Sequence, residues 1–525
     1  MTRLKWLQLT PVVAAVTSFS VTAVAADDPP TKPNPQVAQT MQPAPAPSPE
    51  ATPQPATPET AAPSTPPPPP PEPVATAPAT SPAPPPPEAE EEKPLPPGSF
   101  KVPGTKTTLT LSGYAQFDVT YDFKGRDPQV EDGDWAVHAA SLPLDENYEV
   151  QQKSGQLYLT ARTSRIGIST LTKSDIADIG TKIEGDFNTG NLLSGQTFTN
   201  SVLFRLRHAY GTLSGKYGTL LVGQTWSTFL DMPSYSETVD FNGPGSIALI
   251  RQPQIRYTIP LGGPITLALA AENGPGTDRN GISDTTGPTR RVQQIPDLIA
   301  ALGAAGDWGS ASVGAVTLQY KNAGTPPVPV PAGAPPGTLP TPGGDSYSKQ
   351  GWGVRASAAL KLPWGDTLRA HAVGGNGIGR YIFNAGLSGQ GAVADDAAQD
   401  WHLWQAFSYH VNYTHVWSPH FRSNVTWSQT LFKSNEGDPT VPTFSAATAQ
   451  VTNAPNKRID QLFVNTYYTV TKQVEFGVEY VFGQRRTFGN DDAANDSCNA
   501  QTVGACASQK GTMHRVGASA HFNFF

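Results

Sequence analysis

LTLSGYAQFDVTYDF, at residues 109–123, alternates between apolar and polar side chains. Successive side chains of a β-strand point to opposite faces, so this stretch predicts a strand with two different faces. The apolar face would hold Leu109, Leu111, Ala115, Phe117, Val119, Tyr121 and Phe123. The polar face would hold Thr110, Ser112, Gln116, Asp118, Thr120 and Asp122. Such alternation is hard to reconcile with a helix.

Alternation of the same kind returns in many later segments. The clearest are IGTKIEGDF (179–187), QIRYTI (254–259), VRASAALKL (354–362), FSYHVNYTHVW (407–417) and VEFGVEYVF (474–482). Sixteen strands can be assigned between residues 108 and 524. Segments of about ten alternating residues are typical of transmembrane β-barrels, in which closure pairs every backbone group. The sequence therefore predicts an all-β fold, a transmembrane antiparallel barrel of sixteen strands.

The ends of these segments favour a membrane barrel over a soluble β-sandwich, whose apolar faces would also alternate. Large aromatic residues such as Tyr121, Trp417 and Phe482 stand near strand ends, as in a lipid-facing girdle. The chain ends RVGASAHFNFF (515–525). This ending is similar to the signal that barrel-assembly machinery recognises, although Phe525 stands one step beyond the usual phase.

The N-terminal fifth of the chain is predicted to stay outside the barrel. Residues 1–25 are typical of a secretory signal peptide, with Arg3 and Lys5 at the start and Ala-Val-Ala at the end. A short membrane anchor is the less favoured alternative. Residues 26–99 form a proline-rich arm, because 28 of the 53 prolines lie between Asp27 and Gly98, without any aromatic residue. We expect a disordered, extended periplasmic spacer that contacts peptidoglycan or an envelope protein, or has no partner. The barrel is assigned to residues 100–525.

Composition excludes several other functions. The net charge of −7 gives no basic surface for nucleic acid, and no apolar run after the first 30 residues approaches the roughly 20 residues of a membrane-spanning helix.

Cys498 and Cys506 are predicted to form a disulfide within one loop, and no metal site or cofactor is expected. His371, His410 and His415 could act as bases, but no G-x-S-x-G or H-E-x-x-H motif accompanies them. We therefore expect no enzymatic activity.

Arginines dominate the polar faces, which would line the lumen of a barrel. In QLYLTARTSRIGIS (156–169) the apolar phase changes between Leu159 and Ile166, so a bulge is expected to turn both Arg162 and Arg165 inward. Arg205 and Arg207 share one face, and Arg251 and Arg256 flank a later strand. Guanidinium groups stay charged and bind carboxylates bidentately, so the lumen is expected to favour anions. The alternative is that these arginines pair with Glu184, Asp186 and other carboxylates of the wall.

A long connection between two predicted strands carries acidic and aromatic residues. Residues 227–250 read STFLDMPSYSETVDFNGPGSIALI. This segment resembles the constriction loop of general porins. Folded into the lumen, Asp231, Glu237 and Asp240 would face the arginines across a narrow gap and set a transverse field. An ordinary extracellular loop is the alternative.

Several segments together resemble a known family, the DcaP-like trimeric outer-membrane porins associated with dicarboxylate uptake. They are LTARTSRIGI (159–168), IEGDF (183–187), RLRHAYG (205–211), VGQTWSTFLDMPSYSETVDFNGPG (222–245), RQPQIRYT (251–258) and GNGIGRYI (375–382). The resemblance implies a sixteen-stranded barrel, a homotrimer and a pore-lining role for Arg162, Arg165, Arg205, Arg207, Arg251 and Arg256. Family members often have a coiled coil before the barrel, whereas this chain has the proline-rich arm.

Taken together, the residues and the resemblance predict a Gram-negative outer-membrane porin with its arm in the periplasm. Its expected partners are outer-membrane lipid and small anionic solutes, with dicarboxylates implied by the resemblance. Two alternatives remain open at this point: a barrel that joins envelope layers through the arm, and a general porin without substrate preference.

Overall fold

The computed structural model describes residues 95–125, 137–144, 155–188, 203–273, 282–283, 292–324, 329–330, 343–395, 398–433, 443–445, 450–452, 455–488 and 510–525. The predicted signal peptide, nearly all of the arm, and Cys498 and Cys506 lie outside these residues. No helix in the described part of the chain is long and apolar enough to cross a membrane.

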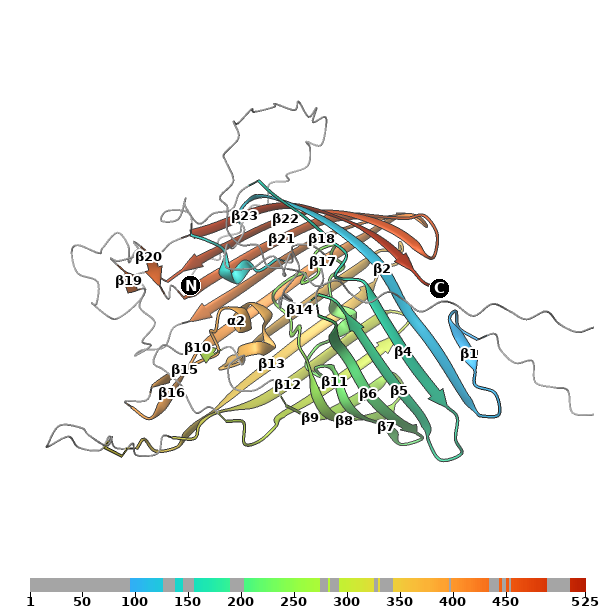
Figure 1. The fold of residues 1–525 in the computed structure, drawn as a ribbon, viewed down its shortest axis with the longest axis horizontal. Helices are drawn as coiled ribbons and strands as arrows, with labels where there is room; N and C mark the ends of the chain where they lie inside the picture. The colour runs from blue at the N-terminus through green and yellow to red at the C-terminus, as the bar shows by residue number, and fades with distance from the viewer. Residues whose placement is uncertain are drawn as a thin grey trace, which may run out of the picture. The chain divides into compact units, whose positions relative to one another are not determined.

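Sixteen antiparallel strands close into a barrel, as predicted (Figure 1). Two of the labelled elements, β3 and β4, count as one strand because both pair with β2 on the same side. The wall consists, in order, of β2 (Thr107–Lys124), β3 (Gln156–Thr160) with β4 (Arg165–Thr172), β5 (Asp178–Asp186), β6 (Arg205–Gly215), β7 (Gly218–Trp226), β8 (Arg251–Gly262), β9 (Ile265–Glu272), β11 (Asp297–Gly306), β12 (Gly309–Asn322), β13 (Tyr347–Lys361), β14 (Thr367–Asn376), β17 (Gln405–Ser418), β18 (Phe421–Lys433), β21 (Asn456–Thr469), β22 (Val474–Thr487) and β23 (Lys510–Asn523).

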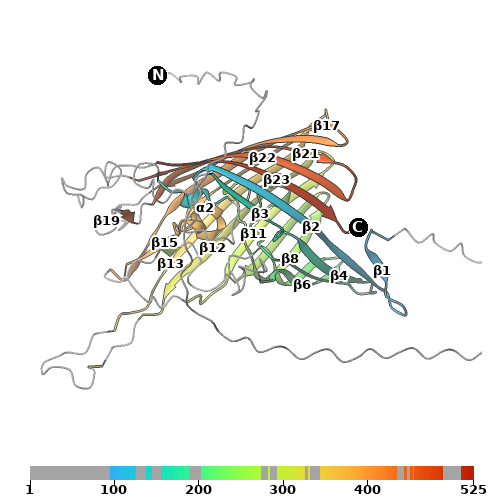
Figure 2. The same ribbon diagram turned by 45° about the horizontal axis from the view of Figure 1, so that its top comes forward.

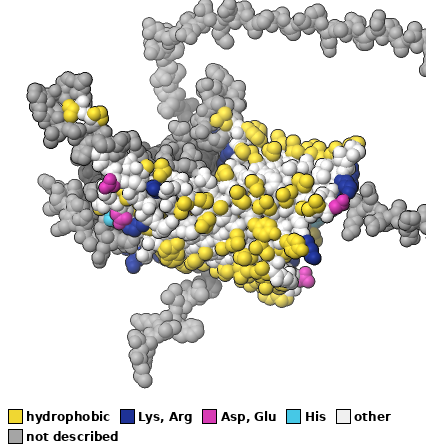
Figure 3. All heavy atoms as spheres, turned by 90° about the horizontal axis from the view of Figure 1, so that it is seen from below, with side chains coloured by type: hydrophobic (Ala, Val, Ile, Leu, Met, Phe, Trp, Pro, Cys, Tyr) yellow, Lys and Arg dark blue, Asp and Glu magenta, His cyan; other side chains and the backbone are white. Residues whose placement is uncertain are grey.

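Apolar side chains face outward from this wall. Ile183 and Ile255 are 61% and 59% exposed, whereas the polar neighbours Glu184 and Gln254 are buried inside. Figure 3 shows the apolar side chains spread over the wall, with charged residues gathered toward its two ends. An apolar surface of this extent would aggregate in water, so its natural solvent is lipid.

The two ends of the barrel differ. At one end the strands are joined by short turns such as residues 216–217 and 307–308, and at the other end by long connections. Exposed aromatic residues mark the short-turn end: Tyr217, Trp308, Trp364, Trp417 and Tyr468. Trp and Tyr are enriched where a membrane meets water, so these side chains form one interfacial girdle.

The seam of the barrel involves both ends of the described chain. β2 pairs with β23 from Tyr114 to Lys124 only. Before Tyr114 in the chain, the same edge of β2 pairs with β1 (Ser99–Lys101), which places Ser99 opposite Thr110. β1 therefore takes the position that β23 leaves.

Several short elements lie in the long connections. They are η1 (Ala139–Ser141), η2 (Met232–Ser234), β10 (Ile282–Ser283), η4 (Gly379–Tyr381), α2 (Phe383–Leu387), β15 (Ala392–Asp395), β16 (Asp400–Leu403), β19 (Thr443–Ser445) and β20 (Gln450–Thr452). β10, β15 and β16 form a small sheet of their own. Figure 2 again shows α2 and β15 at the long-loop end. The apolar core of the molecule includes residues of these connections, such as Phe229, Ile247 and Trp401, so it lies inside the barrel.

Candidate functional site

The first of the predicted lumen arginines lie where the second wall strand is interrupted. β3 ends at Thr160 and β4 begins at Arg165, and Thr163 between them donates a 2.5 Å hydrogen bond from Oγ1 to Asp118 Oδ2. The break lets Arg165 pair with Asp186 of β5 on the inner face. Arg162 is buried within the break, and its carbonyl oxygen accepts a hydrogen bond from the Phe187 amide at 3.0 Å.

A second irregularity turns another arginine inward. The register between β5 and β6 shifts so that Glu184 pairs with His208 and Gly185 pairs with Leu206. Arg207 is the extra residue of this bulge, and it is buried together with His208. A bulge adds one residue to one strand and so allows consecutive side chains to share a face.

Two carboxylates hold this group of guanidinium ions. Asp186 accepts two hydrogen bonds from Arg205, at 2.8 and 2.9 Å, and one from Arg207 at 2.6 Å. Glu184 lies 3.1 Å from Arg207 Nε, 3.4 Å from Arg165 Nε and 2.9 Å from Lys182 Nζ. Each carboxylate is therefore shared among several cations.

Aromatic rings complete the arrangement. The Arg251 guanidinium lies 4.4 Å from the centre of the Trp226 ring, and its buried NH1 nitrogen has no hydrogen-bond partner among the described residues. Phe241 lies over both Arg205 and Arg207, at 5.6 and 5.7 Å. We call Arg165, Arg205, Arg207 and Arg251 the arginine cluster. It holds four guanidinium groups against two carboxylates, so it is positively charged.

The structure therefore brings together four of the six predicted arginines. Arg162 lies in the β3–β4 break. Arg256 lies further along β8 on the inner face, where it makes no ion pair with any residue that the structure describes. Lys182, Trp226 and Phe241 were not predicted as site residues. The same parity that selected Arg205 and Arg207 could have selected Lys182, which lies on the same face of β5 as Glu184.

The connection at residues 227–250, which we call the inner loop, lies against the inner faces of β13 to β23. Ser357 of β13 donates a hydrogen bond to Asp231 at 2.7 Å. His410 of β17 contacts the Ser246 hydroxyl and the Ser234 carbonyl oxygen, at 2.7 and 2.9 Å. Gln461 of β21 accepts a hydrogen bond from the Gly245 amide at 2.9 Å. These contacts fix the inner loop to the wall over much of its length.

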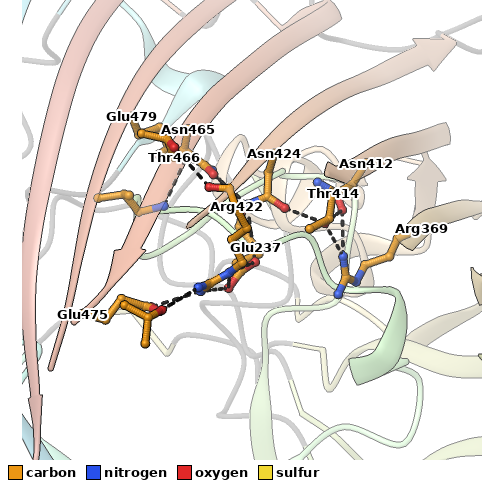
Figure 4. A network of polar contacts seen from close by, with 12 residues as sticks. Glu237, Arg369, Asn412, Thr414, Arg422, Asn424, Asn465, Thr466, Glu475 and Glu479 are labelled. Atoms are coloured by element: carbon orange, nitrogen blue, oxygen red, sulfur yellow. Dashed lines mark hydrogen bonds and ion pairs between the residues drawn. The ribbon is translucent and has the colours of Figure 1, made fainter. Parts of the chain in front are cut away.

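The acidic residues of the inner loop have partners other than the arginine cluster, which differs from our expectation. Figure 4 shows Arg422 of β18 between Glu237 and Glu475, with Arg422 Nε 3.0 Å from Glu237. Asp240 is buried and lies 3.5 Å from Arg515 of β23. Arg422 and Arg515 lie on the part of the wall that the inner loop contacts. They are therefore the arginines that pair with its carboxylates. Phe241, rather than a carboxylate, faces the arginine cluster.

Backbone groups bind Asp240 as well. Its carboxylate accepts hydrogen bonds from the amides of Val137, Asn242 and Gly243, at 2.9, 3.0 and 3.2 Å. Burial raises the pKa of Asp240, although the Arg515 guanidinium and these amides act in the opposite direction. Asp240 therefore holds the inner loop in place and does not face open solvent.

The described residues contain no group of three or more His, Cys, Asp or Glu side chains that could hold a metal ion. What the arrangement offers is a charged inner wall with a fixed loop beside it. Such a surface can bind and guide a charged solute through a barrel.

Several solved structures are similar to this chain. Among solved structures, the outer-membrane channel DcaP of Acinetobacter baumannii matches with 23% identity and a TM-score of 0.58, covering 81% of this chain and 100% of its own. OmpT of Vibrio cholerae matches with 10% identity and a TM-score of 0.46, covering 81% of this chain and 100% of its own. An anion-selective porin from Comamonas acidovorans matches with 12% identity and a TM-score of 0.44, covering 80% and 100%.

The likeness to DcaP confirms the barrel fold that the sequence resemblance implied. A search of curated proteins finds no match. A family model described as a porin subfamily matches residues 97–510. Because that match spans most of the sequence, the chain belongs to the porin subfamily, whose members are channels of the outer membrane.

Proposed function

We propose that this porin admits small organic anions and that dicarboxylates are its preferred solutes. The observation that carries the proposal is the arginine cluster, in which three guanidinium groups share two carboxylates and the fourth, of Arg251, lies over the Trp226 ring. An inner wall with excess positive charge raises the local concentration of anions and lowers that of cations. Arg256 adds a further cation on the same side without an ion-pair partner among the described residues.

Dicarboxylates fit this wall better than monovalent anions for a geometric reason. Arg205 and Arg207 both reach Asp186, while Arg165 and Arg207 both reach Glu184, so neighbouring guanidinium groups already bind carboxylates in pairs. A solute with two carboxylates can contact two such groups at once. The resemblance to DcaP-like porins supports the same class of solute.

The test is the reversal potential of the purified protein in a planar bilayer across a potassium chloride gradient at neutral pH. We expect an anion-selective potential that weakens or changes sign when Arg165, Arg205, Arg207 and Arg251 are all replaced by Gln. Competition of succinate or malonate with chloride current then tests the preference for dicarboxylates. A cation-selective wild-type potential would refute the proposal.

We further propose that the long-loop end faces outward, that the arm begins in the periplasm and that the chain forms a homotrimer. Bacterial barrels carry short turns on the periplasmic side, which supports the orientation. The trimer follows from the family resemblance. Unheated gel electrophoresis and light scattering of the detergent-solubilised protein test it, and a protein that is monomeric by both methods would contradict it.

A further inference from the structure

The connection between β14 and β17, residues 377–404, contacts the wall at several of its described residues. We call it the mouth segment, and its described residues are 377–395 and 398–404. It contains η4, α2, β15 and β16. At 28 positions it is far longer than an ordinary hairpin loop of about two to five residues. Trp401 and Trp404 are 0% and 1% exposed, so the mouth segment has a packed interior.

One side of the mouth segment is anchored to β8 and β11. Arg380 forms an ion pair with Asp297 at the start of β11, and both side chains are buried. Arg380 Nε also donates a 3.1 Å hydrogen bond to Gln252 Oε1 of β8. The Tyr381 hydroxyl donates to Asp297 Oδ2 at 2.7 Å.

The other side is anchored to β18 and β21. Asn384 Nδ2 donates a 3.0 Å hydrogen bond to Thr430 Oγ1 of β18. Gln390 and Asn456 of β21 exchange two hydrogen bonds, at 2.8 and 2.9 Å. Seven wall strands separate β8 from β21 in either direction around the sixteen-stranded barrel. The mouth segment therefore bridges the full width of the lumen.

The mouth segment and the inner loop form one packed body. The amides of Phe383 and Asn384 donate hydrogen bonds to the carbonyl oxygens of Ile247 and Gly245, at 2.9 and 3.0 Å. A Cβ atom at Gly245 would lie only 2.2 Å from Asn384 Oδ1, so glycine is required for this close approach. The rings of Tyr381 and Phe229 meet edge to face, with 5.5 Å between centroids.

The wall is shaped to receive the mouth segment. Gly353 and Gly351 occupy inward positions of β13, where larger side chains would enter the lumen. A Cβ atom at Gly353 would lie 2.3 Å from Ile378 Cδ1, and one at Gly351 would lie 2.5 Å from the Gly377 carbonyl oxygen. Ile378 is fully buried in the space that Gly353 leaves. This fit indicates a permanent position.

We propose that the mouth segment is a second constriction, at the long-loop end, that limits the size of solutes that pass through the lumen. The proposal rests on the channel function proposed above. It separates two tasks: the mouth segment excludes by size, whatever the charge of the solute, and the arginine cluster selects by charge.

Two variants test this proposal by different routes. Gly353→Leu fills the space of Ile378 without changing any charge, and Arg380→Gln removes the charge on the β11 side. Lys349→Gln is the matched control. It breaks the exposed 2.8 Å ion pair between Lys349 of β13 and Asp400 of the mouth segment. Each purified protein is reconstituted for liposome swelling with neutral sugars of increasing size, for single-channel conductance, and for the reversal potential in a potassium chloride gradient.

We expect Gly353→Leu and Arg380→Gln to admit larger sugars than the wild type and to raise conductance by about twofold, since a wider passage carries more current. Lys349→Gln should match the wild type. The reversal potential should keep its sign in all three, because the arginine cluster is unchanged. An unchanged sugar limit and conductance in both variants, with the barrel still heat-modifiable on gels, would overturn the second constriction. An anion-selective wild type with that result would leave the proposed function standing, whereas a wild type without channels would overturn both.

Discussion

Two regions of the inner wall use arginine in opposite ways. In the arginine cluster on β4 to β8, three guanidinium groups share Glu184 and Asp186, and the fourth, of Arg251, lies over the Trp226 ring. On β18 to β23, two guanidinium groups, of Arg422 and Arg515, meet four carboxylates: Glu237, Glu475, Asp122 and Asp240. The first region has excess positive charge and the second has excess negative charge.

The comparison shows that residue type alone does not define the task of an arginine in a channel. An arginine with fewer carboxylates than it can bind is available to a solute. An arginine with more carboxylates holds a loop to the wall, as Arg422 holds Glu237 and Arg515 holds Asp240. The carboxylates of Glu237 and Asp240 are therefore bonded to the wall and do not pair with the arginine cluster.

The largest effect on stability is expected for Arg515→Met, which removes an arginine that holds the inner loop to the wall. Arg515 Nε and NH2 lie 2.6 and 3.0 Å from Asp122, and both side chains are buried. Removing one partner of a buried pair leaves an uncompensated charge, at a cost of about 3–5 kcal/mol. The urea midpoint of unfolding, followed by tryptophan fluorescence, measures the loss. Arg458→Met is the control. It breaks the ion pair between Arg458 and Asp460, in which the arginine is much more exposed than Arg515, and should cost at most about 1 kcal/mol.

The next largest effect concerns the net charge of the arginine cluster. Asp186→Asn removes a carboxylate from Arg205 and Arg207, so the excess positive charge should grow. We expect the chloride-to-potassium permeability ratio to rise by about two- to threefold, given a charge change inside a partly desolvated lumen. Glu475→Gln removes one carboxylate from the opposite wall and should change the ratio less. If Asp186→Asn lowered the ratio, the cluster would not lie on the anion path.

A smaller effect is expected at the tip of the inner loop. Arg422→Gln removes the ion pairs with Glu237 and Glu475, whose side chains are all partly exposed. Exposed pairs contribute about 0–1 kcal/mol, so the stability of the barrel should hardly change. The inner loop should move more, which single-channel recording would detect as greater noise of the open current. A quiet trace equal to the wild type would show that the hydrogen bonds of Val239 and Asp240 to Glu479 suffice.

The smallest effect is expected for Phe241→Ala. Its ring lies over Arg205 and Arg207, and each cation–π contact of this kind contributes about 0.5–1 kcal/mol. We expect a slight loss of stability and a slight rise in conductance, with the reversal potential nearly constant. Phe241→Leu keeps most of the bulk without the aromatic ring, so it separates the two causes. A large change of selectivity in Phe241→Ala would mean that the ring itself contacts the solute.

Much of the wall could be predicted from the sequence because its signal is local. The alternation in residues 109–123 depends only on which face meets lipid, and β2 follows it from Thr107 to Lys124. The change of apolar phase before Ile166 likewise marks the break between β3 and β4. In both cases the pattern can be recognised from residues that are only two positions apart in the chain.

The interior could not be predicted in the same way. Arg380 meets Asp297, and Gly245 meets Gln461, across gaps in the chain of 83 and 216 positions. No periodicity marks such contacts, so the bonded partners of Glu237 and Asp240 were not predicted and the mouth segment was not identified. Two signals were nevertheless present: Trp401 and Trp404 in a connection without alternation, and glycines such as Gly353 and Gly477 at inward positions.

The seam between β2 and β23 has a consequence for biogenesis. Asp122 and Arg515, which meet across it, are 393 positions apart in the chain. The first and last wall strands therefore keep an open edge until they meet, and contacts of such long separation form slowly. An open edge invites pairing with other chains, so this protein should depend on periplasmic chaperones. Gly98, just before β1, lies so close to the Phe525 ring that a Cβ atom there would be 2.8 Å from Phe525 Cδ2, so a residue beyond β23 also helps to hold β1 on the edge of β2.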